Sequence, residues 1–281
     1  MNPPAPKPLR TVAAAQSMSV PGDVPANVQS HLAMVQAAAS QGVQLLVFPE
    51  LSLTGYEPDL LAGHVLDADD AVLAPLRDAA RAAGMAVVVG APVAPLVPGG
   101  KPAICAMTFH ADGRATLYRK RYLHAGEEAF ASAGAEDFQV LPFPGQPTAL
   151  AVCADTTHPE HARDARQGGA ALYACGSVIS EGSYARESGQ LQGYAAEWGL
   201  AVLLANHGAP TGGYPCAGRS AFWAPGGECV VAAPGTGACL VIASQEGSGD
   251  AGEGGDATWQ GRVIDLSAAA TATTATGAPG Q

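Results

Sequence analysis

Residues 45–61 read LLVFPELSLTGYEPDLL, and this stretch predicts both a buried strand and a first reactive side chain. It opens with an almost entirely apolar run, which is typical of a short strand covered on both faces. The run leads to Glu50 at the strand end, ahead of a polar loop. Because a carboxylate there is poorly solvated, its pKa is expected to rise toward that of a general base. A glutamate at a strand end can also serve only to bond the backbone or an arginine, and its position leaves both interpretations open.

Buried strands and amphipathic helices alternate on both sides of this stretch. Segments 9–16 and 43–48 are predicted strands, and apolar residues at helical spacing predict a helix over 26–40 between them. This strand–helix–strand unit is expected to be right-handed. Further helices are predicted over 69–83, 159–166 and 183–197, and further strands over 85–93, 104–110, 115–120, 148–153, 171–176, 199–206, in a hairpin within 220–234, and over 256–266. These elements together indicate a layered α/β fold.

The composition limits the class of protein. The 281 residues are 48% hydrophobic and 14% charged, which is a globular composition in a chain long enough to bury a large core. The formal net charge of −11 argues against binding to nucleic acid or to anionic lipid. The sequence contains no run of about 18 apolar residues, so no membrane span is predicted. The N-terminus lacks the apolar segment of a signal peptide, and we expect a cytoplasmic protein.

We expect one domain over residues 9–266. The proline-rich segment 1–8 and the Ala/Thr/Gly tail 267–281 are predicted to be disordered. The acidic, glycine-rich segment 244–256 is predicted to be a mobile loop, and the sequence gives it no role.

The cysteines predict neither a zinc site nor a disulfide framework. Six are scattered along the chain without a CxxC pair, and no HExxH motif occurs. Most are expected to be small buried hydrophobic residues in a reducing compartment, and no metal or organic cofactor is expected.

A second informative segment is YRKRYLHAGEEAFASAG, residues 118–134. Lys120 ends a predicted hairpin strand, and the acidic pair Glu127 and Glu128 follows after a short loop. A lysine in a closed cleft is a fixed cation that can stabilise an oxyanion or lower the pKa of a thiol. A lysine between two arginines is more often part of a solvated basic face.

A third segment is ALAVCADTTHPEHA, residues 149–162. Cys153 ends an apolar strand and precedes a turn and a helix, a place where a side chain is exposed and backbone N–H groups point into a cleft. A cysteine in such a strand is also often a buried structural thiol. His158 and His161 lie at the predicted helix start and are expected on the surface.

The segments FPELSLTGY, YRKRYLHAGEE and VCADTTHPE, in this order, resemble the three motif regions of the nitrilase (carbon–nitrogen hydrolase) superfamily. The similarity extends through residues 199–228 and covers the chain from residue 9 to about 235. The resemblance implies a four-layer α-β-β-α sandwich and a catalytic Glu-Lys-Cys triad, which falls on Glu50, Lys120 and Cys153.

The resemblance also implies a second glutamate near the lysine. Glu127 fits better by its distance to Gly134, and Glu128 remains possible because Phe130 is displaced from its usual place. Tyr56, Glu128 and the backbone of Ala154 are expected at the substrate, and Tyr56 and His124 are expected to pack or to form hydrogen bonds. The usual prolines of this region are alanines here, Ala125 and Ala133, which leaves the local loop shape open.

Ala154 and Asp155 stand where true nitrilases commonly carry Trp-Glu, which favours an amidase-type reaction. The implied activity is hydrolysis of an amide or carbamoyl group of a small molecule through a cysteine thioester, with release of ammonia. Two alternatives are transfer of the same acyl group to another nucleophile and a non-catalytic scaffold on the same fold. Relatives imply a homodimer or a larger homo-oligomer.

Overall fold

The computed structural model describes residues 11–135, 140–143, 146–246 and 258–267. The predictions for segment 1–8, for nearly all of 267–281 and for most of 244–256 fall outside these residues. The helices within the described ranges are α1 (Val24–Ser40), α2 (Ala74–Ala83), α3 (Pro159–Gln167) and α4 (Tyr184–Trp198), with short 3₁₀ helices η1 (Pro58–Gly63), η2 (Ala71–Leu73), η3 (Glu127–Ala129) and η4 (Cys153–Thr157).

The strands of the described residues form two sheets. The first has the order β13 (Thr258–Asp265), β12 (Cys239–Glu246), β1 (Thr11–Gln16), β2 (Leu45–Val47), β3 (Ala86–Val93), β4 (Ala103–Phe109) and β5 (Ala115–Arg119). The second has the order β11 (Cys229–Ala232), β10 (Ala221–Trp223), β9 (Ala201–Asn206), β8 (Leu172–Ser177), β7 (Thr148–Val152) and β6 (Val140–Leu141). Neighbouring strands β1, β2 and β3 run parallel, and so do β7, β8 and β9.

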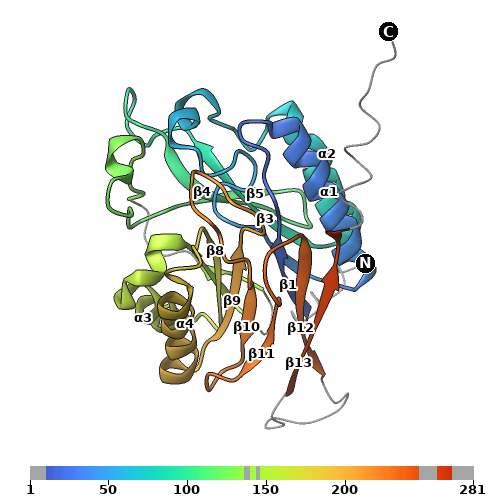
Figure 1. The fold of residues 1–281 in the computed structure, drawn as a ribbon. Helices are drawn as coiled ribbons and strands as arrows, with labels where there is room; N and C mark the ends of the chain where they lie inside the picture. The colour runs from blue at the N-terminus through green and yellow to red at the C-terminus, as the bar shows by residue number, and fades with distance from the viewer. Residues whose placement is uncertain (1–10, 136–139, 144–145, 247–257, 268–281) are drawn as a thin grey trace.

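Side chains that alternate along the strands divide the core into three layers. In β2, Leu45 and Val47 face the layer between the two sheets, whereas Leu46 faces the helices α1 and α2. In β7, Ala149 and Ala151 face α3 and α4 in the same way. Figure 1 shows these two helix pairs on opposite sides of the strands. The predicted α-β-β-α sandwich is therefore confirmed.

Most predicted elements are present with shifted ends. Helix α1 begins two residues early because the Asp23 carboxylate accepts a hydrogen bond from the amide of Ala26. Helix α2 begins at Ala74 and not at residue 69, since Pro75 favours a helix start and the turn before it is 3₁₀. Residues 244–246, predicted as loop, belong to β12, which pairs antiparallel with β13.

The two sheets approach each other closely where the chain leaves β2. A Cβ at Gly176 of β8 would lie 2.6 Å from the carbonyl oxygen of Phe48 and 3.1 Å from the nitrogen of Glu50. A Cβ at Gly90 of β3 would lie 2.2 Å from the nitrogen of Leu51. Glycine on both sides therefore permits the backbone around Glu50 to run between the sheets.

We predict that Gly176→Ala lowers the free energy of unfolding by about 1–3 kcal/mol, because the added methyl group must displace backbone. Urea denaturation measures this. Gly193→Ala is the matched control, since nothing lies within 4 Å of a Cβ at this exposed helical position. That variant should be unchanged or more stable by up to about 1 kcal/mol. Equal stability of Gly176→Ala and the native chain would contradict the prediction.

Candidate active site

The three segments singled out by the sequence meet at one end of the sandwich. Glu50 follows β2 of the first sheet, Lys120 follows β5 of the same sheet, and Cys153 follows β7 of the second sheet. The carboxyl ends of parallel strands lie at one edge of a sheet, and side chains there face the space between the layers. Residues that are distant in sequence are thereby brought together.

Lys120 is the centre of this cluster. Its Nζ lies 2.6 Å from Oε1 of Glu50 and 2.8 Å from Oε1 of Glu127. The side chains of Lys120 and Glu50 are 0% exposed, and that of Glu127 is 2% exposed. Burial lowers the pKa of Lys120, but the attraction of Glu50, Cys153 and Glu127 outweighs this effect and leaves the pKa above its usual value. The lysine is therefore a permanent cation.

Glu127, and not Glu128, faces the cluster. Oε1 of Glu127 also accepts a hydrogen bond of 2.8 Å from the Tyr56 hydroxyl, and its Oε2 accepts one of 2.8 Å from the amide of His124. Glu128 is exposed: its carboxylate accepts a hydrogen bond from the amide of Gly126, and its backbone carbonyl accepts one from Nζ of Lys101. Glu128, which was expected at the substrate, therefore lies outside the cluster around Lys120, because η3 turns the two neighbouring acids in different directions.

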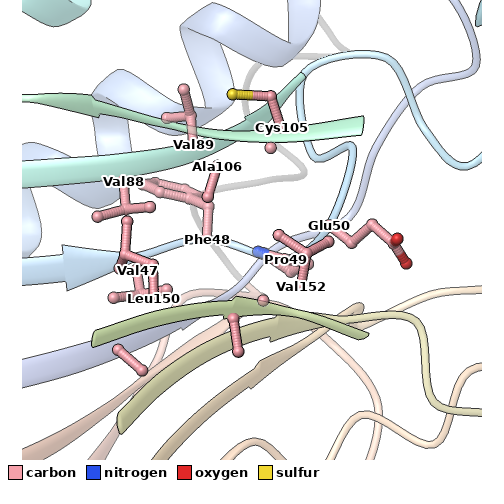
Figure 2. A pocket seen from close by; sticks show the side chains of 14 residues that line it. Val47, Phe48, Pro49, Glu50, Val88, Val89, Cys105, Ala106, Leu150 and Val152 are labelled. Atoms are coloured by element: carbon pink, nitrogen blue, oxygen red, sulfur yellow. The ribbon is translucent and has the colours of Figure 1, made fainter. Parts of the chain in front are cut away.

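Glu50 has the environment of a proton acceptor. Burial raises its pKa, the attraction of Lys120 opposes this, the repulsion of Glu127 adds to it, and together they bring the pKa to about 7. Its Oε2 is buried and has no partner at ordinary hydrogen-bond geometry among the described residues, although the nearby Cys153 thiol lowers the pKa of Glu50. Figure 2 shows the apolar side chains behind Glu50, among them Val47 and Leu150, with the carboxylate pointing away from them.

Cys153 lies on a strained turn. Its φ is +41°, in the left-handed region that L-residues seldom adopt, and it begins η4 directly after β7. The half-buried side chain points toward Val178, whose carbonyl oxygen lies 3.8 Å from Sγ. Burial and the charge of Glu50 raise the pKa of the thiol well above its usual value, and Lys120 opposes them. The resting group is a thiol.

A pocket opens over these groups, and we call it the Cys153 pocket. It has an empty volume of about 260 Å³, including the space at its mouth. Its lining residues are Glu50, Tyr56, His124, Glu127, Cys153, Val178 and Tyr214. Neither lysine nor arginine is among these described residues. Tyr214 packs edge-on against Tyr56, with ring centroids 5.7 Å apart, at the exposed side of the pocket.

Two histidines behind Glu50 were not singled out by the sequence. Nε2 of His207 donates to the carbonyl oxygen of Glu50 at 2.7 Å, and burial lowers the pKa of His207 to about 4. His31 stacks on Phe48 with centroids 3.9 Å apart. His207 follows β9 at the same edge as Cys153, so its place after a buried strand was the available signal.

Two further predictions have different outcomes. His161, expected on the surface, is 0% exposed, because helical spacing places it with Ala162 and Ala165 on the inner face of α3. His158 is partly exposed, in agreement with its predicted place. Ala154 is buried directly after Cys153 within η4.

The family model described as carbon-nitrogen hydrolase matches residues 11–245, which include the whole cluster around Lys120. The chain belongs to the carbon–nitrogen hydrolase family. In this carbon–nitrogen hydrolase, the described helices include none that is long and apolar enough to span a membrane. The same described residues hold no group of three or more His, Cys, Asp or Glu side chains placed to bind a metal ion.

Solved structures of an amidase from Nesterenkonia sp. AN1, of the nitrilase superfamily, are similar to this carbon–nitrogen hydrolase. One of them is a mutant of the amidase that shows Michael addition of acrylamide at its active-site cysteine. It is 29% identical to this chain with a TM-score of 0.75, and the match covers 83% of this chain and 92% of the amidase. Another is in complex with butyramide, also at 29% identity and a TM-score of 0.75, covering 84% and 90%.

A curated relative is the "Hydrolase in pqqF 5'region" of Pseudomonas protegens. It is 32% identical over 157 residues, which is 54% of this chain and 53% of the relative. The chain thus spans about half the length of this relative.

We predict that Lys120→Met destabilises the fold by about 3–5 kcal/mol at pH 8, because two buried carboxylates lose their counter-ion. The triple variant Lys120→Met, Glu50→Gln, Glu127→Gln should recover most of this loss, since no buried charge is left unpaired. Urea denaturation of the two variants and of the native chain measures the free energies of unfolding that this prediction compares. A Lys120→Met variant as stable as the native chain would show that the ammonium does not compensate the two acids.

Proposed function

We propose that this chain is a cysteine-dependent amidohydrolase that cleaves the carbon–nitrogen bond of an amide or carbamoyl group and releases ammonia through a thioester. The observation that carries the proposal is the buried cluster in which the Lys120 ammonium contacts both Glu50 and Glu127 beside the thiol of Cys153. An acid–base group and a nucleophile line one pocket, and a fixed cation lies directly against the acid–base group.

The first step forms the thioester. Glu50, with its pKa raised to about 7 by burial, takes the thiol proton, and the sulfur attacks the carbonyl carbon as it loses that proton. Because the pKa of the free thiol is raised, the thiolate forms only as the base takes the proton during attack. The free Oε2 of Glu50 is available to receive it.

The oxyanion needs positive groups at the carbonyl oxygen. Lys120 supplies a full charge, and the amide of Ala154 lies in the first turn of η4, ahead of the first intrahelical hydrogen bond. Donors aimed at a developing oxyanion typically contribute about 10²–10³ in rate.

The second half of the reaction releases ammonia, hydrolyses the thioester and regenerates the free enzyme. Glu50 passes its proton to the departing nitrogen, and ammonia leaves as the carbon–nitrogen bond breaks. Glu50 then takes a proton from water, whose oxygen attacks the thioester carbonyl. As the carbon–sulfur bond breaks, Glu50 returns this proton to the Cys153 sulfur and the carboxylic acid is released, so that the groups return to their starting states.

The pocket favours a short, uncharged acyl group. The carboxylates of Glu50 and Glu127 line the pocket, and none of its lining residues is a lysine or an arginine that could pair with an acidic substrate. Lys120 is already shared between Glu50 and Glu127. The binding of butyramide by the Nesterenkonia amidase agrees with a small neutral amide.

The six cysteines are free, which supports a reducing, cytoplasmic setting for the enzyme. Assembly into at least a dimer stays a prediction from the family resemblance, and light scattering of the purified protein would test it.

We predict that an ammonia-release screen over amides, carbamoyl compounds and ω-amides yields turnover that Cys153→Ala abolishes with the fold retained. Short neutral amides should be better substrates than amides that carry a carboxylate. Cys229→Ala is the matched control, since it removes an exposed cysteine away from the pocket. Turnover by Cys153→Ala would overturn the mechanism.

We predict that kcat/KM falls about tenfold per pH unit below about pH 7, because protonated Glu50 cannot accept the thiol proton. The charge of Glu127 raises the pKa of Glu50, so Glu127→Gln should move this limb to lower pH. Glu128→Gln, which removes the exposed neighbouring charge, should leave the limb in place. A profile that is flat down to pH 5 in the native enzyme would contradict the role of Glu50.

A further inference from the structure

One buried carboxylate is not used by this reaction. Asp155 is 0% exposed, stands two residues after Cys153, and is not among the residues that line the Cys153 pocket. An unpaired buried carboxylate would be costly, so the partners that keep it in the interior define its role.

Four donors bind the two oxygens of Asp155. Oδ1 accepts hydrogen bonds from the amides of Arg121 at 3.0 Å and Tyr122 at 2.9 Å. Oδ2 accepts from the amide of Val152 at 2.9 Å and from the hydroxyl of Tyr118 at 2.7 Å. Hydrogen bonds to an ionised acceptor are about twice as strong as those between neutral groups.

These partners are unusual for a helix-capping carboxylate. The bond from Val152 is local and is what a cap at the start of η4 requires. The other three come from residues 33 to 37 positions away, and they lie on both sides of Lys120. Asp155 therefore joins the backbone that carries the cation to the turn that carries the thiol.

A second set of buried groups orients the Tyr118 hydroxyl. Because Tyr118 gives its proton to Asp155, its oxygen accepts from Nε2 of His161 at 2.7 Å. Nδ1 of His161 then accepts from the Tyr173 hydroxyl at 2.8 Å. Burial lowers the pKa of His161, in agreement with this neutral form.

We propose that Asp155 is a positioning residue that holds the segment of Lys120 in register with the turn of Cys153. The proposal rests on the proposed function. It assigns Asp155 no contact with the substrate: the residue acts through Lys120 and Cys153, whose relative placement sets the reaction rate. A misplacement of about 1 Å can cost on the order of 10² in rate.

The first test is Asp155→Asn. The amide keeps one acceptor oxygen and replaces the other by an NH₂ group that cannot accept, so donors near Cys153 or Lys120 lose their partner. We expect kcat to fall about 10–100-fold with KM within about twofold, because the pocket lining is intact. The rate of Cys153 alkylation by iodoacetamide, measured by peptide mass spectrometry, should fall in parallel.

The second test is a matched pair that does not depend on the folding of Asp155→Asn. Tyr118→Phe and Tyr173→Phe each remove one buried hydroxyl next to His161, and both should lose a similar free energy of unfolding. Only Tyr118 contacts Asp155. We therefore expect kcat and Cys153 alkylation to fall several-fold in Tyr118→Phe and to change less than twofold in Tyr173→Phe.

Equal losses of kcat in the two tyrosine variants would overturn the proposal and assign the network to stability alone. A rise of KM at unchanged kcat in Asp155→Asn would overturn it as well. If the native protein hydrolyses no amide, the proposed function fails, and the alkylation rates still decide whether Asp155 positions Cys153.

Discussion

The charge balance among Lys120, Glu50 and Glu127 constrains the rest of this site. Burying an ion costs several kcal/mol, and the attraction between ions repays the cost only when their geometry is good. The backbone of Lys120 is accordingly fixed on both sides: its amide donates to the carbonyl oxygen of Ile104, and its carbonyl oxygen accepts from the amide of Gly134. One flexible side chain thus becomes a fixed charge.

The backbone near the other two reactive groups is held in conformations that it would not adopt alone. Leu51 has φ +51° directly after Glu50, and Cys153 has φ +41°. A left-handed residue of this kind costs about 1–3 kcal/mol, which the packing around it must offset. The two sheets provide that packing, and these backbone conformations let the side chains of Glu50 and Cys153 line one pocket.

Local patterns along the chain were sufficient for the strands and helices of the fold, whereas the central cluster was predicted only because three motif segments together resemble those of the nitrilase superfamily. Apolar strands that end in Glu50 and Cys153 predict that each residue lies at the carboxyl end of a buried strand, and the structure shows that the two strands belong to different sheets. The sequence could not choose between Glu127 and Glu128, since neighbouring acids differ only in the direction that a single turn gives them. The sequence also misplaced His161 of α3, because its partners Tyr118 and Tyr173 belong to β5 and β8, which are distant along the chain.

The high pKa of the Cys153 thiol has a further consequence for the lifetime of the enzyme. Peroxides and other oxidants attack thiolates, and a sulfur that keeps its proton is oxidised slowly even when small molecules can reach it. Under the proposed mechanism, in which the Cys153 sulfur loses its proton only as it attacks, we expect the thiol to be protected between turnovers. We therefore expect resistance to oxidative inactivation to follow from the same burial that raises the pKa of Glu50.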